Sequence, residues 1–235
     1  MKDPLKIYEV LQKEYGPQGW WPLSSCKKKK GFDERGYHRR EFSYPKTDAQ
    51  RFEIIIGAVL TQNTSWRNVE KAMLNLEESA LLDIEKIRKM KKGKLASLIR
   101  PAGYFNQKAE RLIIVSKLFH DKGFAELRKQ KTGELRKLLL SVKGVGPETA
   151  DSMILYAFSK PSFVVDTYTR RILGRLGHDE NSYEEVQQIF HSSLDPDVEL
   201  FQEYHALMVE HAKQHCKTRP DCEKCPFSPK CPKRL

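Results

Sequence analysis

The last twenty residues of the chain hold four cysteines, and this segment constrains the fold more than any other. The spacing is Cys216-x5-Cys222-x2-Cys225-x5-Cys231, with lysines, arginines and prolines between the cysteines. The segment has too little apolar material to form a hydrophobic core of its own, so a metal centre held by four thiolates is the natural source of its order. The sequence therefore predicts a C-terminal metal loop with these four cysteines as ligands.

Two disulfides and a zinc ion are the alternatives for these cysteines. Disulfides suit a secreted chain, but the N-terminus begins polar and has no apolar signal-peptide core. Zinc sites usually have two close Cys-x2-Cys pairs, whereas only Cys222 and Cys225 have that spacing here. His211 and His215 are either a part of a mixed His/Cys zinc site or two solvated helix residues. We expect a 4Fe-4S cluster, with zinc as the alternative, and Cys26 as a lone thiol.

The chain is basic, with 42 Lys and Arg against 31 Asp and Glu and a net charge of +11. This excess suggests a polyanionic partner, although charge alone does not establish one. Residues 27–30 are four lysines inside a polar loop, 24–46, and such a run is more often a solvated tether than a contact surface. The longest apolar run, 52–60, is well short of the roughly 18 residues of a membrane span. We expect a soluble, cytoplasmic monomer that does not contact a membrane.

Apolar residues recur at helical spacing along most of the chain, without an alternating strand pattern or an internal repeat. A helix that Thr47 or Asp48 can cap has one apolar face, made by Phe52, Ile55, Ile56, Val59 and Leu60. Further helices are expected at 5–15, 66–76, 81–90, 94–99, 105–122, 133–142, 147–158, 167–176, 183–193 and 198–215. The predicted class is all-α. We expect one helical domain at 48–160 and a second formed by 1–47 with 161–235.

A glycine-containing turn at 142–147 (Val-Lys-Gly-Val-Gly-Pro) lies between two of these helices. Gly144 and Gly146 permit backbone conformations that a side chain would forbid, and Pro147 suits a first helical turn. The exposed amides of such a hairpin can bind a phosphate oxygen, and its carbonyls could hold a monovalent cation. The phosphate-binding residues would be Lys143, Gly144, Val145 and Gly146. A plain helix connection that contains two glycines is the alternative.

Asp166 lies 18 residues after Glu148, between the apolar pair Val164-Val165 and a predicted helix. An aspartate in this position is most often an N-cap, because its carboxylate accepts the amides of the first turn. Delivered at a fixed distance from a phosphate-binding hairpin, the carboxylate could also face the sugar of a captured nucleotide.

These features together resemble the helix-hairpin-helix (HhH-GPD) superfamily of DNA glycosylases, in its endonuclease III-like branch. They are the segment 144–151 (Gly-Val-Gly-Pro-Glu-Thr-Ala-Asp), Asp166 in its Val-Asp-Thr setting and the terminal cysteines. Trp20-Trp21-Pro22 and the segments 60–64 and 100–109 most resemble the endonuclease III-type 3-methyladenine DNA glycosylases. The resemblance covers most of the chain from Phe52 onward. It implies a two-lobed helical fold with Asp166 near the junction of the lobes, and double-stranded DNA with a damaged base as the partner.

Two departures from the family pattern carry information. Bifunctional members have a lysine nucleophile in the hairpin helix, but the matching residue here is Glu148. A carboxylate cannot form a Schiff base with the sugar, so we expect a monofunctional enzyme without AP lyase activity. The family's cluster has six residues after its first cysteine, whereas this chain has five after Cys216. A change of one residue in a loop is easily absorbed.

The resemblance implies that the enzyme flips a damaged base out of the duplex and hydrolyses its N-glycosidic bond. An alkylated purine is cationic and leaves readily, so Asp166 would stabilise the oxocarbenium-like sugar and activate water. Gln62 resembles the family residue that fills the vacated gap; otherwise it is a loop residue that bonds its own backbone. Trp20 and Trp66 are candidates to stack on the cationic base, with Trp21 buried behind them.

Basic residues around the metal loop and after Asp166 are further candidates for phosphate contacts. Arg170 and Arg171 are expected to bind phosphate, or else to be solvated helix charges. The basic residues of the metal loop are Lys217, Arg219, Lys224, Lys230, Lys233 and Arg234.

Two other functions remain open at this point. One is a mismatch or oxidised-base glycosylase of the same fold, because pocket details decide the substrate. The other is a non-catalytic DNA-binding module. Asp166 and the tryptophans favour an enzyme, because a pure binding module has no need of an acid in a pocket.

Overall fold

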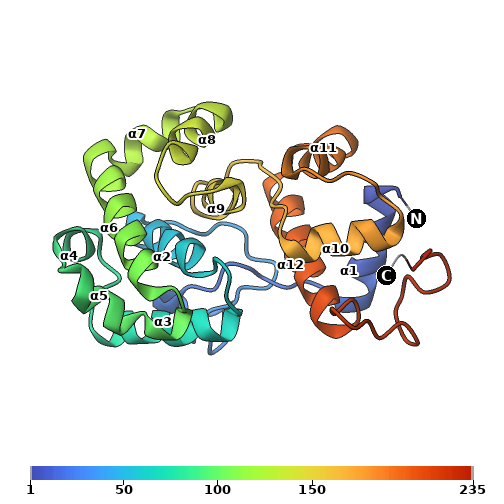
Figure 1. The fold of residues 1–235 in the computed structure, drawn as a ribbon, viewed down its shortest axis with the longest axis horizontal. Helices are drawn as coiled ribbons and strands as arrows, with labels where there is room; N and C mark the ends of the chain where they lie inside the picture. Colours follow the sequence, from blue (N-terminus) through green and yellow to red (C-terminus); the bar gives the residue numbers. More distant parts are fainter. Residues whose placement is uncertain (1, 234–235) are drawn as a thin grey trace. The chain divides into compact units, whose positions relative to one another are not determined.

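The computed structural model describes residues 2–233, and these residues form helices and turns without a strand (Figure 1). The all-α prediction is therefore confirmed. The chain divides into two compact units. Unit 1 consists of residues 1–22, 26–42 and 161–235, and unit 2 consists of residues 23–25 and 43–160.

Unit 2 contains a continuous series of helices. The longer ones are α2 (Asp48–Leu60), α3 (Trp66–Glu78), α6 (Phe105–Lys122) and α8 (Thr132–Leu140). The shorter elements are α4 (Ile84–Lys89), α5 (Lys92–Leu98), the 3-10 turn η2 (Arg100–Ala102), α7 (Phe124–Lys129), α9 (Pro147–Ser152) and the π-helical η3 (Met153–Ala157).

Helix α2 is the centre of unit 2. Of the two predicted caps, Thr47 is the N-cap, and it forms a capping box with Gln50. The prediction of a single apolar face is wrong, because every residue of 50–60 is buried. The reason is that α3, α6, α9 and η3 pack around the helix (Figure 1). Arg51 on α2 is buried, and its Nη2 donates to the carbonyl of Pro45 at 3.0 Å.

A buried lysine fixes the C-terminal end of α2. Lys108 on α6 is fully buried, and its Nζ donates to the carbonyls of Leu60 at 2.8 Å and Ala102 at 2.6 Å. Leu60 is the last residue of α2, where carbonyls lack partners within the helix. Burial, followed by the charge of Arg111, lowers the pKa of Lys108 to about 8. This ammonium therefore fixes the start of the loop that contains Gln62.

An ion pair connects the two helices on either side of the glycine hairpin. Arg136 on α8 donates from Nε to Asp151 Oδ1 at 2.9 Å and from Nη2 to Oδ2 at 3.1 Å. Asp151 on α9 is fully buried. The two-pronged geometry holds α8 and α9 in one relative orientation, which also fixes the turn between them.

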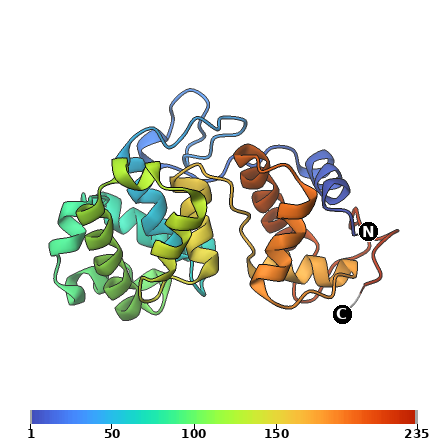
Figure 2. The same cartoon turned by 90° about the horizontal axis from the view of Figure 1, so that it is seen from above.

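Unit 1 contains α1 (Pro4–Tyr15), α10 (Thr167–Leu176), α11 (Tyr183–Ser193) and α12 (Val198–Gln214). Helix α12 packs against α1 and α10 (Figures 1 and 2). The core is aromatic: the rings of Phe163 and Phe190 stack with centroids 3.5 Å apart, and both meet Tyr204 edge to face. The Tyr204 hydroxyl donates to the carbonyl of Pro4 at 2.8 Å, so the first turn of α1 is bonded directly to α12.

Most helix positions agree with the sequence prediction, and one helix was not predicted. Helix α7 begins directly after Gly123, which ends α6 with a φ of +73°. Six residues are too few to display a helical period, so α7 has no clear sequence signal. The segment 24–46 is irregular apart from the 3-10 turn η1 (Ser24–Cys26), in agreement with the predicted loop.

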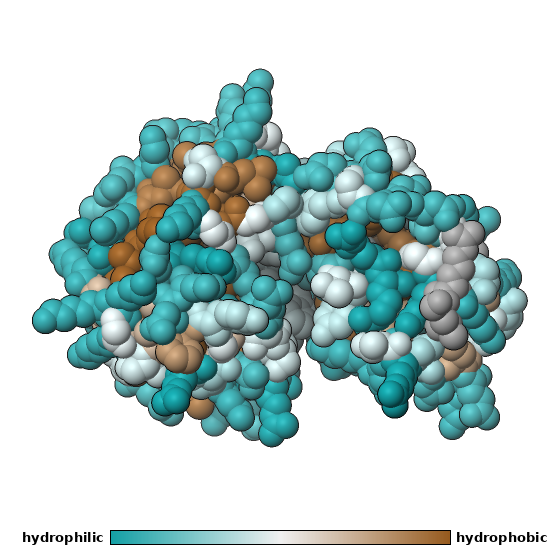
Figure 3. Space-filling view, in the orientation of Figure 1, coloured by the Kyte–Doolittle hydropathy of each residue, from teal (hydrophilic) through white to brown (hydrophobic). Residues whose placement is uncertain are grey.

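Hydrophilic side chains cover most of the face in Figure 3, as expected for a chain with this charge content. Among residues 2–233, no helix is both long and apolar enough to cross a bilayer.

We expect Arg136→Met to lower the free energy of unfolding by about 2–3 kcal/mol, because the buried Asp151 carboxylate loses its guanidinium partner while Arg136 itself is partly exposed. Urea unfolding followed by circular dichroism measures the change. The double variant Arg136→Met/Asp151→Leu should be more stable than the single variant, since it buries no charge at this place. Equal stability of the two variants would contradict this role of the pair.

Candidate functional site

The hairpin between α8 and α9 is a tight turn with outward-facing amides. Gly144 has a φ of +86°, a region that L-residues rarely adopt, and the amide of Val145 donates to the carbonyl of Val142 at 3.0 Å. Gly144 and Gly146 are exposed, and their own amides donate no hydrogen bond within residues 2–233. Gly146 is the N-cap of α9, so these donors lie at the positive end of a helix. The amides of Gly144 and Gly146 are therefore left for an anion, whereas the amide of Val145, which was predicted as part of the phosphate site, is used within the turn.

Gln62 is bonded to this hairpin. Its Nε2 donates to the carbonyl of Gly144 at 3.0 Å and to Thr149 Oγ1 at 2.8 Å. Its Oε1 accepts from Arg111 Nη1 at 2.5 Å. The alternative interpretation, in which Gln62 bonds its own backbone, is wrong, because the amide reaches a turn more than 80 residues away in sequence.

The exposed Lys143 is paired with a carboxylate. Its Nζ lies 3.3 Å from Glu110 Oε1, and Glu110 also binds Lys92 at 2.9 Å. Surface pairs of this kind contribute little and exchange readily. Lys143 therefore lies beside the hairpin, and its ammonium can exchange Glu110 for another anion.

Asp166 is the N-cap of α10 and is buried. Its Oδ1 accepts the amide of Thr169 at 2.7 Å, so the capping interpretation is confirmed. Its Oδ2 lies 3.7 Å from Nε2 of His205, a buried residue of α12. Burial raises the pKa of Asp166, but His205 and the Thr169 amide outweigh that effect and the net pKa is lowered. The carboxylate is therefore held ionised in a site with little water.

The extended segment before Asp166 is fixed by side chains of α11. Gln187 donates to the carbonyl of Phe163 at 2.7 Å, and the amide of Phe163 donates to His191 Nε2 at 3.0 Å. The amide of Val165 donates to the hydroxyl of Tyr183 at 3.3 Å. These bonds determine where the carboxylate of Asp166 lies within unit 1.

The three tryptophans belong to different units. Trp20 and Trp21, in unit 1, meet edge to face with centroids 5.7 Å apart, and Trp21 is buried while Trp20 is half exposed. The ammonium of Lys213 lies 5.6 Å from the centroid of Trp20. Trp66 begins α3 in unit 2 and is also half exposed. The expectation that Trp21 lies behind Trp20 agrees with these exposures.

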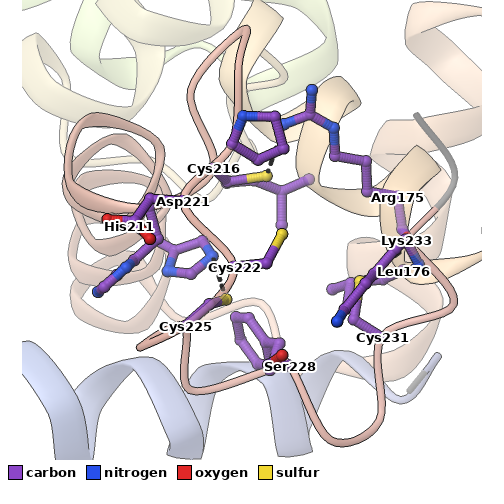
Figure 4. Close-up of a pocket in the computed structure, with 14 residues that line it drawn as sticks. Arg175, Leu176, His211, Cys216, Asp221, Cys222, Cys225, Ser228, Cys231 and Lys233 are labelled. Carbon is purple, nitrogen blue, oxygen red and sulfur yellow. Dashed lines mark hydrogen bonds between the residues drawn. The ribbon is translucent and has the colours of Figure 1, made fainter.

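The four predicted ligand cysteines line one cavity of unit 1 (Figure 4). Cys216 is buried and the other three are partly exposed. Burial, and then the neighbouring thiols, raise the pKa of Cys225, although the amide of Phe227 opposes the change. Within residues 2–233, no three His, Cys, Asp or Glu side chains form a group that could hold one metal ion. Four thiols around one cavity are the donor set that an iron–sulfur cluster requires.

Two side chains point at the cysteine sulfurs (Figure 4). Arg175 Nη1 lies 3.3 Å from Cys216 Sγ, and the same guanidinium donates to the carbonyls of Lys217 and Thr218. His211 Nε2 lies 3.9 Å from Cys225 Sγ, while its Nδ1 bonds the Tyr15 hydroxyl at 2.8 Å. Burial and His215 lower the pKa of His211 to about 4. The interpretation of His211 as a solvated residue is wrong, because α1 and the cysteine loop cover it.

The basic residues near the cysteines fall into two groups. Arg171 donates to the carbonyl of Cys216 at 2.8 Å and Arg170 to that of Asn181, so both bind protein rather than being free helix charges. The exposed basic residues of the metal loop are Lys217, Arg219, Lys224, Lys230 and Lys233, and the acids Asp221 and Glu223 are exposed beside them. Arg234 lies outside the described residues.

Three residues that contact Gln62 or Asp166 were missed by sequence reasoning: His205, Arg111 and Thr149. His205 and Arg111 each lie within a long helix that has other polar residues, so nothing in the sequence distinguishes them. Thr149 lies in the predicted hairpin helix, but no local pattern indicates that its hydroxyl accepts from Gln62.

Comparison with known proteins assigns the family. Residues 56–196 match the HhH-GPD superfamily of base excision DNA repair proteins. A relative from Methanocaldococcus jannaschii, named as a candidate DNA repair glycosylase, is 41% identical over 96% of this chain and 94% of its own. Endonuclease III of Thermotoga maritima is 31% identical over 79% of this chain and 84% of its own.

Solved structures agree with this assignment. The Helicobacter pylori 3-methyladenine DNA glycosylase, bound to 1,N6-ethenoadenine, is 29% identical with a TM-score of 0.72, over 90% of this chain and 98% of that one. A trapped covalent complex of endonuclease III with DNA has a TM-score of 0.74 at 22% identity, over 99% of this chain and 97% of that one, which supports the fold. From the match over most of the chain and the helical fold with its glycine hairpin, this protein belongs to the HhH-GPD superfamily of base excision DNA repair proteins.

Proposed function

We propose that the protein is a monofunctional DNA glycosylase that flips an alkylated purine out of double-stranded DNA and hydrolyses its N-glycosidic bond. The observation that carries the proposal is Asp166, a buried carboxylate with a lowered pKa at the start of α10. Alkylation at N3 or N7 makes the purine cationic and a good leaving group. The enzyme then has to stabilise the positive charge that develops on the sugar, and an ionised, preorganised carboxylate does so.

Asp166 would also direct the attacking water. Its Oδ1 is committed to the Thr169 amide, so Oδ2 beside His205 is the oxygen that can orient or deprotonate water. His205 would keep this carboxylate ionised and correctly turned until the sugar arrives.

The absence of lyase chemistry is supported by the residue that replaces the family lysine. Glu148 is exposed in the first turn of α9, and a carboxylate cannot form an imine with the sugar. Lys108 in the same unit is no substitute, since it is fully buried and bonded to two carbonyls. The sugar that remains in the strand after release of the base would therefore be an intact abasic site.

Binding to the duplex would use the backbone rather than the base sequence. The amides of Gly144 and Gly146 and the side chain of Lys143 would hold one phosphate at the hairpin, where a monovalent cation could also bind. Lys217 and Arg219 would contact phosphates elsewhere on the duplex, whereas Arg171 would support the metal loop through the carbonyl of Cys216 and Arg170 the connection before α11 through that of Asn181. Gln62 would fill the gap that the everted nucleotide leaves.

Selection of a cationic base would rely on aromatic faces. Trp20 has a half-exposed ring that already attracts the Lys213 ammonium, so its face can bind a positive charge. Trp66, half exposed at the start of α3, is the other candidate for an aromatic face, and Trp21 would support Trp20 from behind. Neutral purines gain no such attraction, which gives selectivity for damage with few hydrogen bonds.

The four cysteines would hold a 4Fe-4S cluster, with zinc as the alternative. The cluster would cross-link a loop that has little hydrophobic core of its own. Its role would be structural rather than redox, because hydrolysis of the N-glycosidic bond needs no electron transfer. Arg175 would stabilise the thiolate of Cys216 and fix the backbone of the loop through Lys217 and Thr218.

We expect the protein to release alkylated purines from duplex DNA, and Asp166→Asn to abolish release, because the amide has no charge to offer the sugar. Mass spectrometry of bases released from alkylated, deaminated and oxidised duplexes is the measurement. The asparagine still caps α10, so the variant should remain folded. Borohydride should not trap the parent protein on DNA. Trapping, or full activity of the variant, would contradict the proposal, and release of only deaminated or oxidised bases would favour another specificity.

Replacement of His205 should shift the acidic limb of the pH profile of kcat/KM. Because His205 lowers the pKa of Asp166, its loss raises that pKa, and the active carboxylate is then protonated at a higher pH. His205→Phe removes the imidazole and its hydrogen bonding, whereas His205→Gln keeps a donor. The acidic limb should therefore move upward from parent to Gln to Phe. An unmoved limb in the Phe variant would show that His205 does not act through Asp166.

Purified protein should contain about four iron atoms per chain and a broad visible absorption. Cys222→Ser should lower both iron content and absorption, whereas Cys26→Ser, which alters a cysteine outside the loop, should change neither. Bound zinc without visible absorption would establish the alternative metal.

A further inference from the structure

The amide of Gln62 is held in a defined orientation by its partners in unit 2. An arginine can only donate, so the contact with Arg111 identifies the Gln62 oxygen. The Gln62 nitrogen then faces the Gly144 carbonyl and the Thr149 hydroxyl, which both accept from it. Both N–H groups of the amide are used. We refer to Gly144, Thr149 and Arg111 as the Gln62 dock.

The side chain of Arg111 lies directly against Gly144 and forms one side of the Gln62 dock. A Cβ on Gly144 would lie 2.5 Å from Arg111 Nε and 2.8 Å from its Cδ, so the guanidinium packs directly against the glycine. Arg111 forms no ion pair with a carboxylate among residues 2–233. Its position one turn after Lys108, which anchors α2, places it beside the loop that contains Gln62. The dock therefore joins the loop after α2, helix α6 and the hairpin.

The docked position is incompatible with filling a gap in DNA. A side chain inserted between bases cannot keep donating to the hairpin carbonyl and to Thr149, which is buried. Gln62 must exchange these partners for groups on the bases. The strength of the dock then determines how easily insertion occurs.

We propose that Thr149 and Arg111 are positioning residues, which hold Gln62 on the hairpin until an everted nucleotide leaves a gap. This inference rests on the proposed function, in which Gln62 fills that gap. At an intact base pair, insertion must break the dock and also displace a stacked base. At a lesion the base leaves more readily, so release of Gln62 is favoured there. The dock is broken only in the inserted complex, so it opposes binding to a gapped duplex and leaves binding without insertion unaffected.

Thr149→Val and Thr149→Ser form a matched pair for the test. Valine keeps the shape of threonine but removes the acceptor, whereas serine keeps the hydroxyl. Binding of the full chain is measured to a duplex with a tetrahydrofuran abasic analogue, which already has a gap, and to the undamaged duplex. We expect Thr149→Val to bind the abasic duplex about fivefold more tightly, the effect of one hydrogen bond, with undamaged binding unchanged. Thr149→Ser should behave as the parent.

The Gln62→Ala background isolates the dock from other effects. Here Thr149→Val should no longer tighten binding, because no amide remains to be released. As a second probe, Arg111→Met loses a charge and should weaken binding to both duplexes, yet its preference for the abasic duplex should rise. Unchanged or weaker abasic binding by Thr149→Val, or a gain that persists in Gln62→Ala, would overturn the inference. A parent protein with no preference for the abasic duplex would refute gap filling itself, and the dock with it.

Discussion

The turn between α8 and α9 can close only because residue 144 has no side chain. Its φ of +86° disfavours any other residue, and Arg111 fills the place where a Cβ would stand. The Arg136–Asp151 pair holds the flanking helices so that the turn keeps its shape. From this arrangement follow the exposed amides for a phosphate, the carbonyl that binds Gln62, and the position of Glu148 at the start of α9. A backbone constraint at one residue thus organises the hairpin and the side chains around it in unit 2.

In unit 1, Asp166 organises its surroundings in a similar way. The two oxygens of its carboxylate have different partners. Oδ1 satisfies an amide at the N-terminus of α10, and Oδ2 faces His205. The capping bond helps to keep the carboxylate ionised, and the helix keeps it immobile. In the proposed reaction, such a carboxylate would not need to reorganise as charge develops on the sugar.

Local patterns in the sequence predicted much of the fold. The capping box at Thr47, the glycine hairpin and the N-cap role of Asp166 follow from short motifs whose physics is confined to one turn. The all-round burial of α2 could not be predicted, because it depends on helices that are distant in sequence. The four cysteines were predicted as one group, and they do line one cavity. His205, the partner of Asp166, and Arg111 and Thr149, the partners of Gln62, could not be identified from the sequence. The contacts of a polar helix residue depend on which distant segments pack against it.

Lys108 has a consequence for chemical labelling of this lysine-rich chain. Its amine is fully enclosed, donates to two carbonyls and has a pKa of about 8. An amine-specific reagent would modify the surface lysines at once but could reach Lys108 only when α2 and α6 separate. Once they separate, the low pKa of the enclosed state no longer applies and the amine reacts as an ordinary lysine. The rate at which this one amine is acylated would therefore measure how often the interior of unit 2 opens.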